Sequence, residues 1–276
     1  MTGVQQVGIG VRDVDAAFRW YHRHFGFDVP VFDDQARAEL MVRYTGGEAH
    51  SRRALLALNM AGGGGFEIWQ FKSRDPQPPA FSPELGDLGI LEVRLKSQNV
   101  GALHQTLVTR IPDHLSRLHM DPDDSPVFAV TDPFGNRFRI TAGKGWFREG
   151  RSRSAVKPGG SPVKGLCGGV CGVTIGVSNI DASLPLYRDV LGFTQTIYDE
   201  SGVFTDLDSN RSFRRVLLHR PAAEEGAFSR LFGYSEVELL QSLDREGRKI
   251  FEGRYWGDLG FIHACFDVVD MDGLKA

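Results

Sequence analysis

The protein has 276 residues, of which 41% are hydrophobic and 24% are charged, and its formal net charge is -3 at pH 7. One ordinary domain needs fewer residues, so two domains are the starting expectation. The charge balance gives no electrostatic reason to expect a nucleic acid or an anionic membrane as a partner. A small-molecule partner is expected instead.

The N-terminal segment MTGVQQVGIGVRDVD has neither a basic leader before a long apolar run nor a small-residue cleavage site. No stretch approaches the roughly 20 apolar residues of a membrane span. We therefore expect a cytoplasmic protein. Its three cysteines, Cys167, Cys171 and Cys265, are too few for a disulfide framework, and free thiols are favoured over a zinc site.

An internal repeat organises the sequence. The segment QVGIGVRDVDAAFRWYHRHFGF at 6–27 aligns without a gap with GVTIGVSNIDASLPLYRDVLGF at 172–193. Further pairs are FEIWQF (66–71) with VELLQS (237–242), and GILEVRLKSQNVGAL (89–103) with GFIHACFDVVDMDGL (260–274). Repeats of this kind indicate repeated structural units. The chain is predicted to contain four modules, and the fourth stops within its helix.

Modules one and three each begin with a strand of alternating character. Val7 and Ile9 point to one face of the first strand, whereas Gln6 and Gly8 point to the other. We expect a helix to bury the first face and the second to line a cavity.

A helix is expected next in each of these modules. Asp13 and Asn179 are candidate N-caps, and Gly26 and Gly192 are candidate C-terminal stops. Pro185 lies inside the second of these helices, where a proline removes a backbone hydrogen bond, so a kink or a late helix start is expected.

Strands are expected after the helices. In module one they are predicted at 39–44, 52–60 and 65–71, and in module three at 203–208, 214–220 and 236–242. The sequence VFAVTDPFGNRFRI at 127–140 predicts two strands joined by a tight turn. Gly, Ser and basic residues dominate the following segment, so we predict a first domain at 1–148, a linker at 149–169 and a second domain at 170–276.

These features, namely the opening strand, the Asp–helix–Tyr–Leu-Gly-Phe sequence and the Asp-Pro-x-Gly-Asn hairpin, resemble the vicinal-oxygen-chelate superfamily. This superfamily includes glyoxalases, bleomycin resistance proteins and extradiol ring-cleaving dioxygenases. The resemblance implies an α+β fold of tandem βαβββ modules, paired into cupped mixed sheets with the helices outside. It covers nearly the whole chain outside the linker and is specific for the fold, but not for the reaction.

The resemblance also implies a divalent metal at the centre of each cup, held by residues of the first and last strands of two paired modules. Modules one and two would form the first pair, whose four positions are Gln6, Glu67, Glu92 and Arg139. An arginine cannot donate an electron pair to a metal and repels a cation. We therefore expect a degenerate, metal-free centre with Arg139 paired to Glu67 or Glu92; the alternative is a site that binds a substrate carboxylate.

Modules three and four would form the second pair, whose positions are Gly172, Glu238, His263 and a residue beyond Ala276. A lone histidine on a strand is more often a hydrogen-bonded core or surface residue than a ligand. His263, however, aligns with Glu92 at the ligand position, and Glu238 aligns with Glu67. The resemblance implies a final-strand glutamate as third ligand and a divalent Fe, Mn, Ni, Co or Zn ion.

The function expected first is a metal-dependent, glyoxalase-like lyase or isomerase acting on a small substrate with neighbouring oxygens. Glu238 would serve as ligand or general base, while strand residues such as Trp69, Arg94 and Arg215, with Gln70 and Gln241, would shape the pocket. An extradiol dioxygenase is the first alternative, although Gly172 lies where that class needs a histidine. A metal-free binding or resistance protein is the second. The fourth module is predicted to have its first strand and part of its helix but no hairpin, so we expect the native chain to continue past Ala276 or another chain to complete the sheet. An unpaired strand edge would also favour homo-oligomers.

Overall fold

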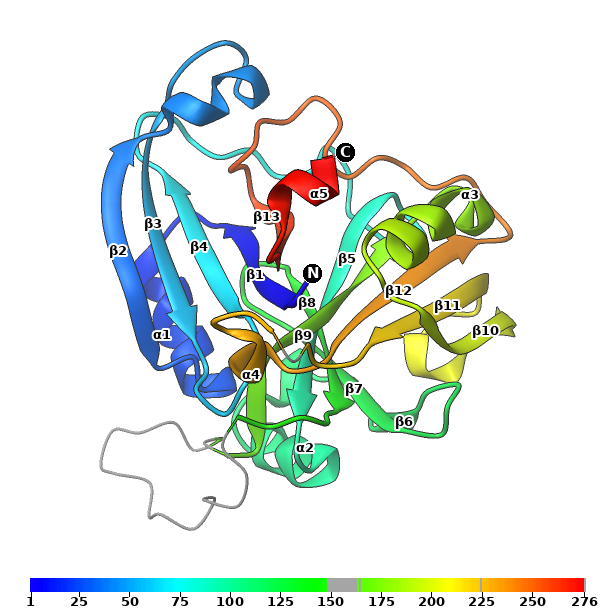
Figure 1. Ribbon diagram of the computed structural model, residues 1–276. Coiled ribbons are helices and arrows are strands. Elements are labelled where there is room, and N and C mark those ends of the chain that lie inside the picture. The colour runs from blue at the N-terminus through cyan, green and yellow to red at the C-terminus, as the bar shows by residue number, and fades with distance from the viewer. Residues whose placement is uncertain (148–162, 164, 224, 276) are drawn as a thin grey trace.

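The computed structural model describes residues 1–147, 163, 165–223 and 225–275. Two curled mixed sheets face different directions, and a few helices lie outside them (Figure 1). The predicted α+β class is therefore confirmed. Most of the predicted linker, 149–169, lies outside the described residues, and its last three residues already belong to a strand. None of the described helices has the length and hydropathy that crossing a bilayer takes.

The five-stranded sheet contains module one and the first strand of module four. Its strand order is β13-β1-β4-β3-β2. The strands are β1 (Gly3–Gly10), β2 (Val29–Arg37), β3 (Ser51–Leu58), β4 (Gly65–Phe71) and β13 (Gly260–Asp267). Its helical elements are α1 (Val14–Phe25), η1 (Glu39–Tyr44) and, after β13, α5 (Met271–Lys275).

The eight-stranded sheet contains modules two and three, in the order β10-β11-β12-β9-β5-β8-β7-β6. Module two supplies β5 (Gly89–Ser97), α2 (Val100–Val108), η2 (Pro112–His114), β6 (His119–Met120), β7 (Pro126–Thr131) and β8 (Arg137–Ala142). Module three supplies β9 (Cys167–Gly176), α3 (Ile180–Pro185), η3 (Leu186–Val190), β10 (Gln195–Val203), η4 (Thr205–Leu207), β11 (Ser212–Arg220), α4 (Ser229–Phe232) and β12 (Ser235–Ser242).

The modules pair differently from the prediction. β1 runs antiparallel to β13 and β5 runs antiparallel to β9, so module one pairs with module four and module two with module three. The predicted pairing of one with two and three with four is wrong. Both arrangements join an odd-numbered module to an even-numbered one, and equivalent positions meet at each centre in either case. The repeat alone therefore could not distinguish them.

Two predicted strands are also wrong. Residues 39–44 form the 3-10 helix η1, and residues 205–207 form η4. The true outer strands, β2 and β10, come earlier in each module. β2 is exposed along its whole length and carries Asp33 and Asp34, because an edge strand with two exposed faces needs no apolar alternation.

The helix boundaries follow the predicted capping residues. The side chains of Asp13 and Asn179 accept hydrogen bonds from the first turns of α1 and α3, and Gly26 ends α1 in the left-handed conformation at φ 77°. Pro185 ends α3, and the chain continues as a π-helical turn. The expected irregularity at this proline is confirmed.

The two faces of β1 differ as predicted. Val7 and Ile9 are fully buried and belong to the same hydrophobic core as Tyr21 and Phe25 of α1. The opposite, concave face of β1 therefore presents Gln6 and Gly8.

The glycine run 62–65 joins the two sheets. Gly63, at φ 112°, approaches Gly169 so closely that a Cβ on Gly63 would lie 2.8 Å from the Cα of Gly169. The backbones of Gly64 and Val170 exchange two hydrogen bonds of 2.7 and 2.9 Å. The two sheets thus meet backbone to backbone, at a place where a side chain would not fit.

Candidate metal centre

Three polar side chains meet on the concave face of the five-stranded sheet. Gln6 comes from β1, Glu67 from β4 and His263 from β13. The Nε2 of Gln6 donates a 2.8 Å hydrogen bond to Oε2 of Glu67, and Nε2 of His263 lies 3.3 Å from the same oxygen. The structure thus brings together one ligand candidate of the expected second pair and two of the expected first pair.

Gly8 makes this approach possible. It pairs with Glu67 on one side and with His263 on the other, so the three residues form one row across the sheet. A Cβ on Gly8 would lie 2.4 Å from Cε1 and 2.5 Å from Nδ1 of His263. The imidazole therefore occupies the space that a side chain on residue 8 would need. The corresponding residue of module three is Thr174.

Two tryptophans form an apolar wall beside the histidine. The ring of Trp256 stacks on that of His263 with a centroid distance of 5.4 Å and an interplanar angle of 10°. Trp69 packs edge-on against Trp256 at 4.4 Å. The sequence reasoning did not identify Trp256, although it stands directly before the repeated GDLG segment, where the other copy has Leu85.

These residues fit a divalent cation. An imidazole nitrogen, a carboxylate oxygen and an amide oxygen are all donors that such ions accept. The side chains of His263 and Glu67 are 26% and 15% exposed, so the centre is partly shielded and not closed. The buried Nδ1 of His263 has no hydrogen-bond partner among the described residues. The imidazole is therefore not held in place by a complete structural hydrogen-bond network.

The equivalent centre of the eight-stranded sheet is built from Glu92, Arg139, Gly172 and Glu238, and its chemistry is different. Glu238 is fully buried and accepts from Arg94 Nη1 at 2.9 Å and from Arg215 Nε at 2.7 Å. The hydroxyls of Tyr198 and Thr174 donate to it at 2.9 and 2.8 Å. Both of its oxygens are therefore already engaged.

Further ion pairs surround Glu238. The Nε of Arg139 donates to Glu92 at 2.6 Å, and its Nη1 donates to Asp206 at 2.8 Å. The predicted pair of Arg139 with Glu92 is confirmed. We call the whole group the ion cluster; it comprises Arg94, Arg137, Arg139, Arg215, Glu92, Asp206, Glu236 and Glu238. Its four guanidinium groups balance its four carboxylates.

The ion cluster keeps its carboxylates charged. Burial raises the pKa of Glu92, but the charges of Arg139 and Arg137 outweigh it and lower the pKa to about 2. Burial also opposes ionisation of Glu238, yet Arg215, Arg94 and Arg139 hold its pKa far below its usual range. The guanidinium groups thus already supply the positive charge at this centre. A metal ion does not fit here.

The predicted ligand pair of Glu238 with His263 is therefore wrong. His263 lies in the five-stranded sheet, whereas Glu238 lies in the eight-stranded sheet within the ion cluster. The predicted role of Glu238 as general base is also unsupported, because its oxygens accept hydrogen bonds from four neighbours. The alignment assigned the positions to the right strands, but the module pairing placed them in the wrong cups.

Other residues expected to shape a pocket have structural contacts. Arg94 and Arg215 belong to the ion cluster. The side-chain oxygens of Gln70 and Gln241 accept hydrogen bonds from the backbone N–H groups of Val14 and Ile180, at the starts of α1 and α3. Of the five, Trp69 alone lies beside the candidate metal centre.

Comparison with known proteins supports this reading of the fold. The family model of the Glyoxalase/Bleomycin resistance protein/Dioxygenase superfamily matches residues 3–140, half of the chain. A comparison with curated proteins gives no match.

Solved structures show the same fold. A glyoxalase I variant from Zea mays is 12% identical with a TM-score of 0.50, and the match covers 89% of this chain and 70% of that one. A putative dioxygenase from Bacillus subtilis is 13% identical with a TM-score of 0.54, and the match covers 88% of this chain and 65% of that one. The chain thus spans about two thirds of each structure's length, and at such low identity the likeness shows the fold alone. The family model matches half of the chain, and the chain therefore belongs to the glyoxalase/bleomycin resistance protein/dioxygenase superfamily.

Proposed function

We propose that the protein is a metal-dependent enzyme of the glyoxalase-like lyase or isomerase type, acting on a small molecule with neighbouring oxygens. Gln6, Glu67 and His263 would hold the divalent ion. The observation that carries the proposal is the meeting of these three side chains around one carboxylate oxygen. Among the described residues, Glu67 has no arginine or lysine partner, unlike its counterpart Glu238.

A divalent ion at this centre would supply Lewis-acid stabilisation of an oxyanion on the substrate. The residues of the chain would do the remaining work. Glu67 receives its described contacts at Oε2, so Oε1 is left to accept a proton from a substrate carbon. Gln6 fixes the rotamer of this carboxylate by its hydrogen bond, and Trp256 fixes the plane of His263 by stacking.

The donor set favours this chemistry over ring cleavage by dioxygen. The iron centres of such oxygenases use two imidazoles and one carboxylate. The present centre has one imidazole, one carboxylate and one amide, because Gln6 stands where the second histidine would be needed. An extradiol dioxygenase is therefore the less favoured proposal.

Metal content tests the proposal directly. We would purify the wild type without chelator and measure Fe, Mn, Ni, Co and Zn, alongside His263→Ala and Glu67→Gln. The control is His22→Ala, on α1, away from the concave face. Near-stoichiometric metal in the wild type and the control, lost from both site variants, is the expected result.

The opposite outcome is equally clear. If the wild type holds no metal even after reconstitution with each of these ions, the enzymatic proposal is wrong. A metal-free binding protein would then be the better description. A metal retained in both site variants would place the centre elsewhere.

A further inference from the structure

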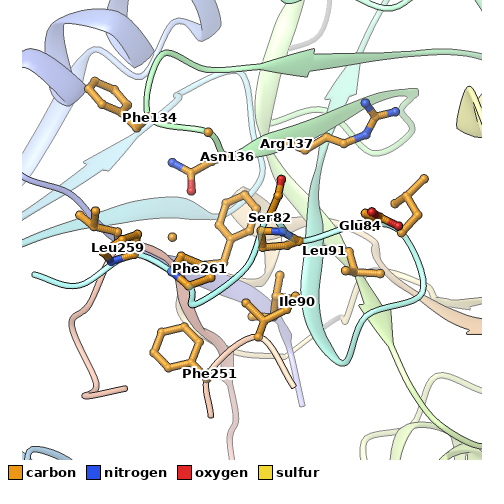
Figure 2. A pocket seen from close by; sticks show the side chains of 17 residues that line it. Ser82, Glu84, Ile90, Leu91, Phe134, Asn136, Arg137, Phe251, Leu259 and Phe261 are labelled. Carbon is orange, nitrogen blue, oxygen red and sulfur yellow. The ribbon is translucent and has the colours of Figure 1, made fainter. Parts of the chain in front are cut away.

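A cavity of about 320 Å³ lies apart from the candidate metal centre, between the two sheets. It is bounded by the first residues of β5, β8 and β13 and by the loops that precede β5 and β13. Figure 2 shows Asn136 and Arg137 along one side of it, and Ile90 and Phe251 along the other. Its volume is at the lower end of the range for small-molecule sites.

The lining of the cavity is mainly apolar. The residues that give it this character include Pro79, Ile90, Leu91, Phe134, Phe251 and Phe261. Three aromatic rings and three prolines among the lining residues favour a flat hydrocarbon body. The cavity therefore suits a ligand of about the size of one substituted ring.

Arg137 is the one cationic side chain among the described residues that line the cavity. Its Nε donates to Glu92 at 2.6 Å, its side chain is 27% exposed, and its terminal nitrogens have no acceptor among the described residues. The exposed part of the guanidinium offers further N–H donors, and a carboxylate is the acceptor that matches their geometry. The side of the cavity that holds Arg137 therefore favours an anion.

A second lining residue limits the charge of that anion. Glu84 also lines the cavity, and its side chain is 52% exposed. Its carboxylate forms ion pairs with Arg211 at 3.4 Å and with Arg245 at 4.0 Å. Its carboxylate disfavours a second negative charge on the ligand. One carboxylate is thus matched to the cavity better than two.

We propose that this cavity binds a small monocarboxylic acid with an aromatic or similarly compact apolar body, its carboxylate on Arg137 and its ring among Ile90, Leu91 and Phe261. Such a ligand would touch the starts of strands from both sheets. Binding would therefore stabilise the contact between the sheets and raise the melting temperature. This proposal does not depend on the metal centre.

Isothermal titration calorimetry of the full chain tests the proposal with three probes. Phenylacetate is expected to bind with one-to-one stoichiometry. Phenylacetamide, which keeps the shape and removes the charge, and phenylmalonate, which adds a second carboxylate, are each expected to bind at least about tenfold more weakly. Equal affinity for the acid and the amide would overturn the proposal, as would no binding of phenylacetate at millimolar concentration.

Two variants locate the site. Arg137→Gln is expected to weaken phenylacetate binding about tenfold or more, and Glu92 keeps Arg139 as a partner in this variant. Ser82→Trp, at an exposed lining position, fills the cavity without changing its charge and is expected to abolish binding. Because Ser82 is exposed, this second variant remains informative if Arg137→Gln fails to fold.

Two controls complete the design. Arg188→Gln removes an exposed arginine that is paired with Asp189 and is not among the lining residues, and it is expected to bind like the wild type. His263→Ala removes the imidazole of the candidate metal centre, where a carboxylate could also bind. If phenylacetate binding is lost in His263→Ala and kept in Ser82→Trp, the cavity is not the site and the proposal is wrong.

Discussion

The imidazole of His263 lies over Gly8, in the space that a side chain on residue 8 would take. The two residues face each other across β1 and β13, and Glu67 lies on the other side of Gly8. In the eight-stranded sheet the equivalent place is taken by Thr174, whose hydroxyl bonds to Glu238. The absence of a side chain at residue 8 therefore decides how close the histidine and the carboxylate come.

Replacing Gly8 by alanine is expected to displace His263 and weaken metal binding about 10- to 100-fold, the range observed when groups that orient a ligand are disturbed. Competition titration with a chromophoric chelator measures this affinity. Gly101→Ala is the matched control, because a Cβ there meets only Asn99 Oδ1 at an ordinary 3.7 Å. Unchanged affinity in Gly8→Ala would show that the imidazole does not hold the ion.

The ion cluster makes a prediction about stability. Glu238→Gln leaves the four guanidinium groups of the ion cluster with three carboxylates in a fully buried site, although Arg94 keeps Glu236 and Arg215 keeps Asp206. The free energy of unfolding is therefore expected to fall by about 3–5 kcal/mol. Urea denaturation followed by circular dichroism gives this value. The comparison variant is Asp181→Asn, which removes an ion pair to Arg214 at the surface and should cost below about 1 kcal/mol. Similar losses in both variants would contradict the structural role assigned to Glu238.

The buried carboxyl of Asp121 predicts that the stability of the protein depends on pH. Burial, and then a hydrogen bond with Asp123, raise the pKa of its carboxyl to about 8. The unfolded chain ionises this group near its ordinary pKa of about 3.9. Its contribution to stability is therefore complete below about pH 4 and is lost as the pH rises through 8.

Asp121→Asn removes this ionisation and tests the sign. Its melting temperature relative to wild type is expected to rise steadily between pH 4 and pH 8 and then to level off. Differential scanning calorimetry across that range measures the difference. Asp113→Asn, at an exposed position of η2, is the control and should show a nearly constant difference. A constant difference for Asp121→Asn as well would mean that the carboxyl ionises normally.

The fold could be predicted from the sequence because each copy of the internal repeat corresponds to one structural module. The alternation in β1 placed Gln6 on the concave face, and the alignments placed Glu67 and His263 at ligand positions. Which modules share a sheet depends instead on contacts between strands far apart in sequence. The error in pairing moved each candidate ligand to the wrong partner without changing its strand.

The ion cluster could be predicted only in part. Arg139 was recognisable as an obstacle to metal binding because a guanidinium cannot be a ligand. Arg94 and Arg215 looked like residues of an open cup, since a charged residue that alternates with apolar ones usually faces water. Their burial depends on Glu236 and Glu238, which the fold brings to them on β12, and on Asp206, which it brings to them on η4.

The backbone contact between Gly63 and Gly169 has a consequence for how the protein can change over evolutionary time. Main-chain atoms alone determine the distance between the two sheets at that point. Side-chain substitutions on the concave face of either sheet therefore leave this contact unchanged. One cup could therefore exchange potential ligands for arginines while the other kept its histidine, with the relative placement of the two sheets undisturbed. A contact made by backbone atoms alone thus allows the residues at the centres of the two sheets to change independently.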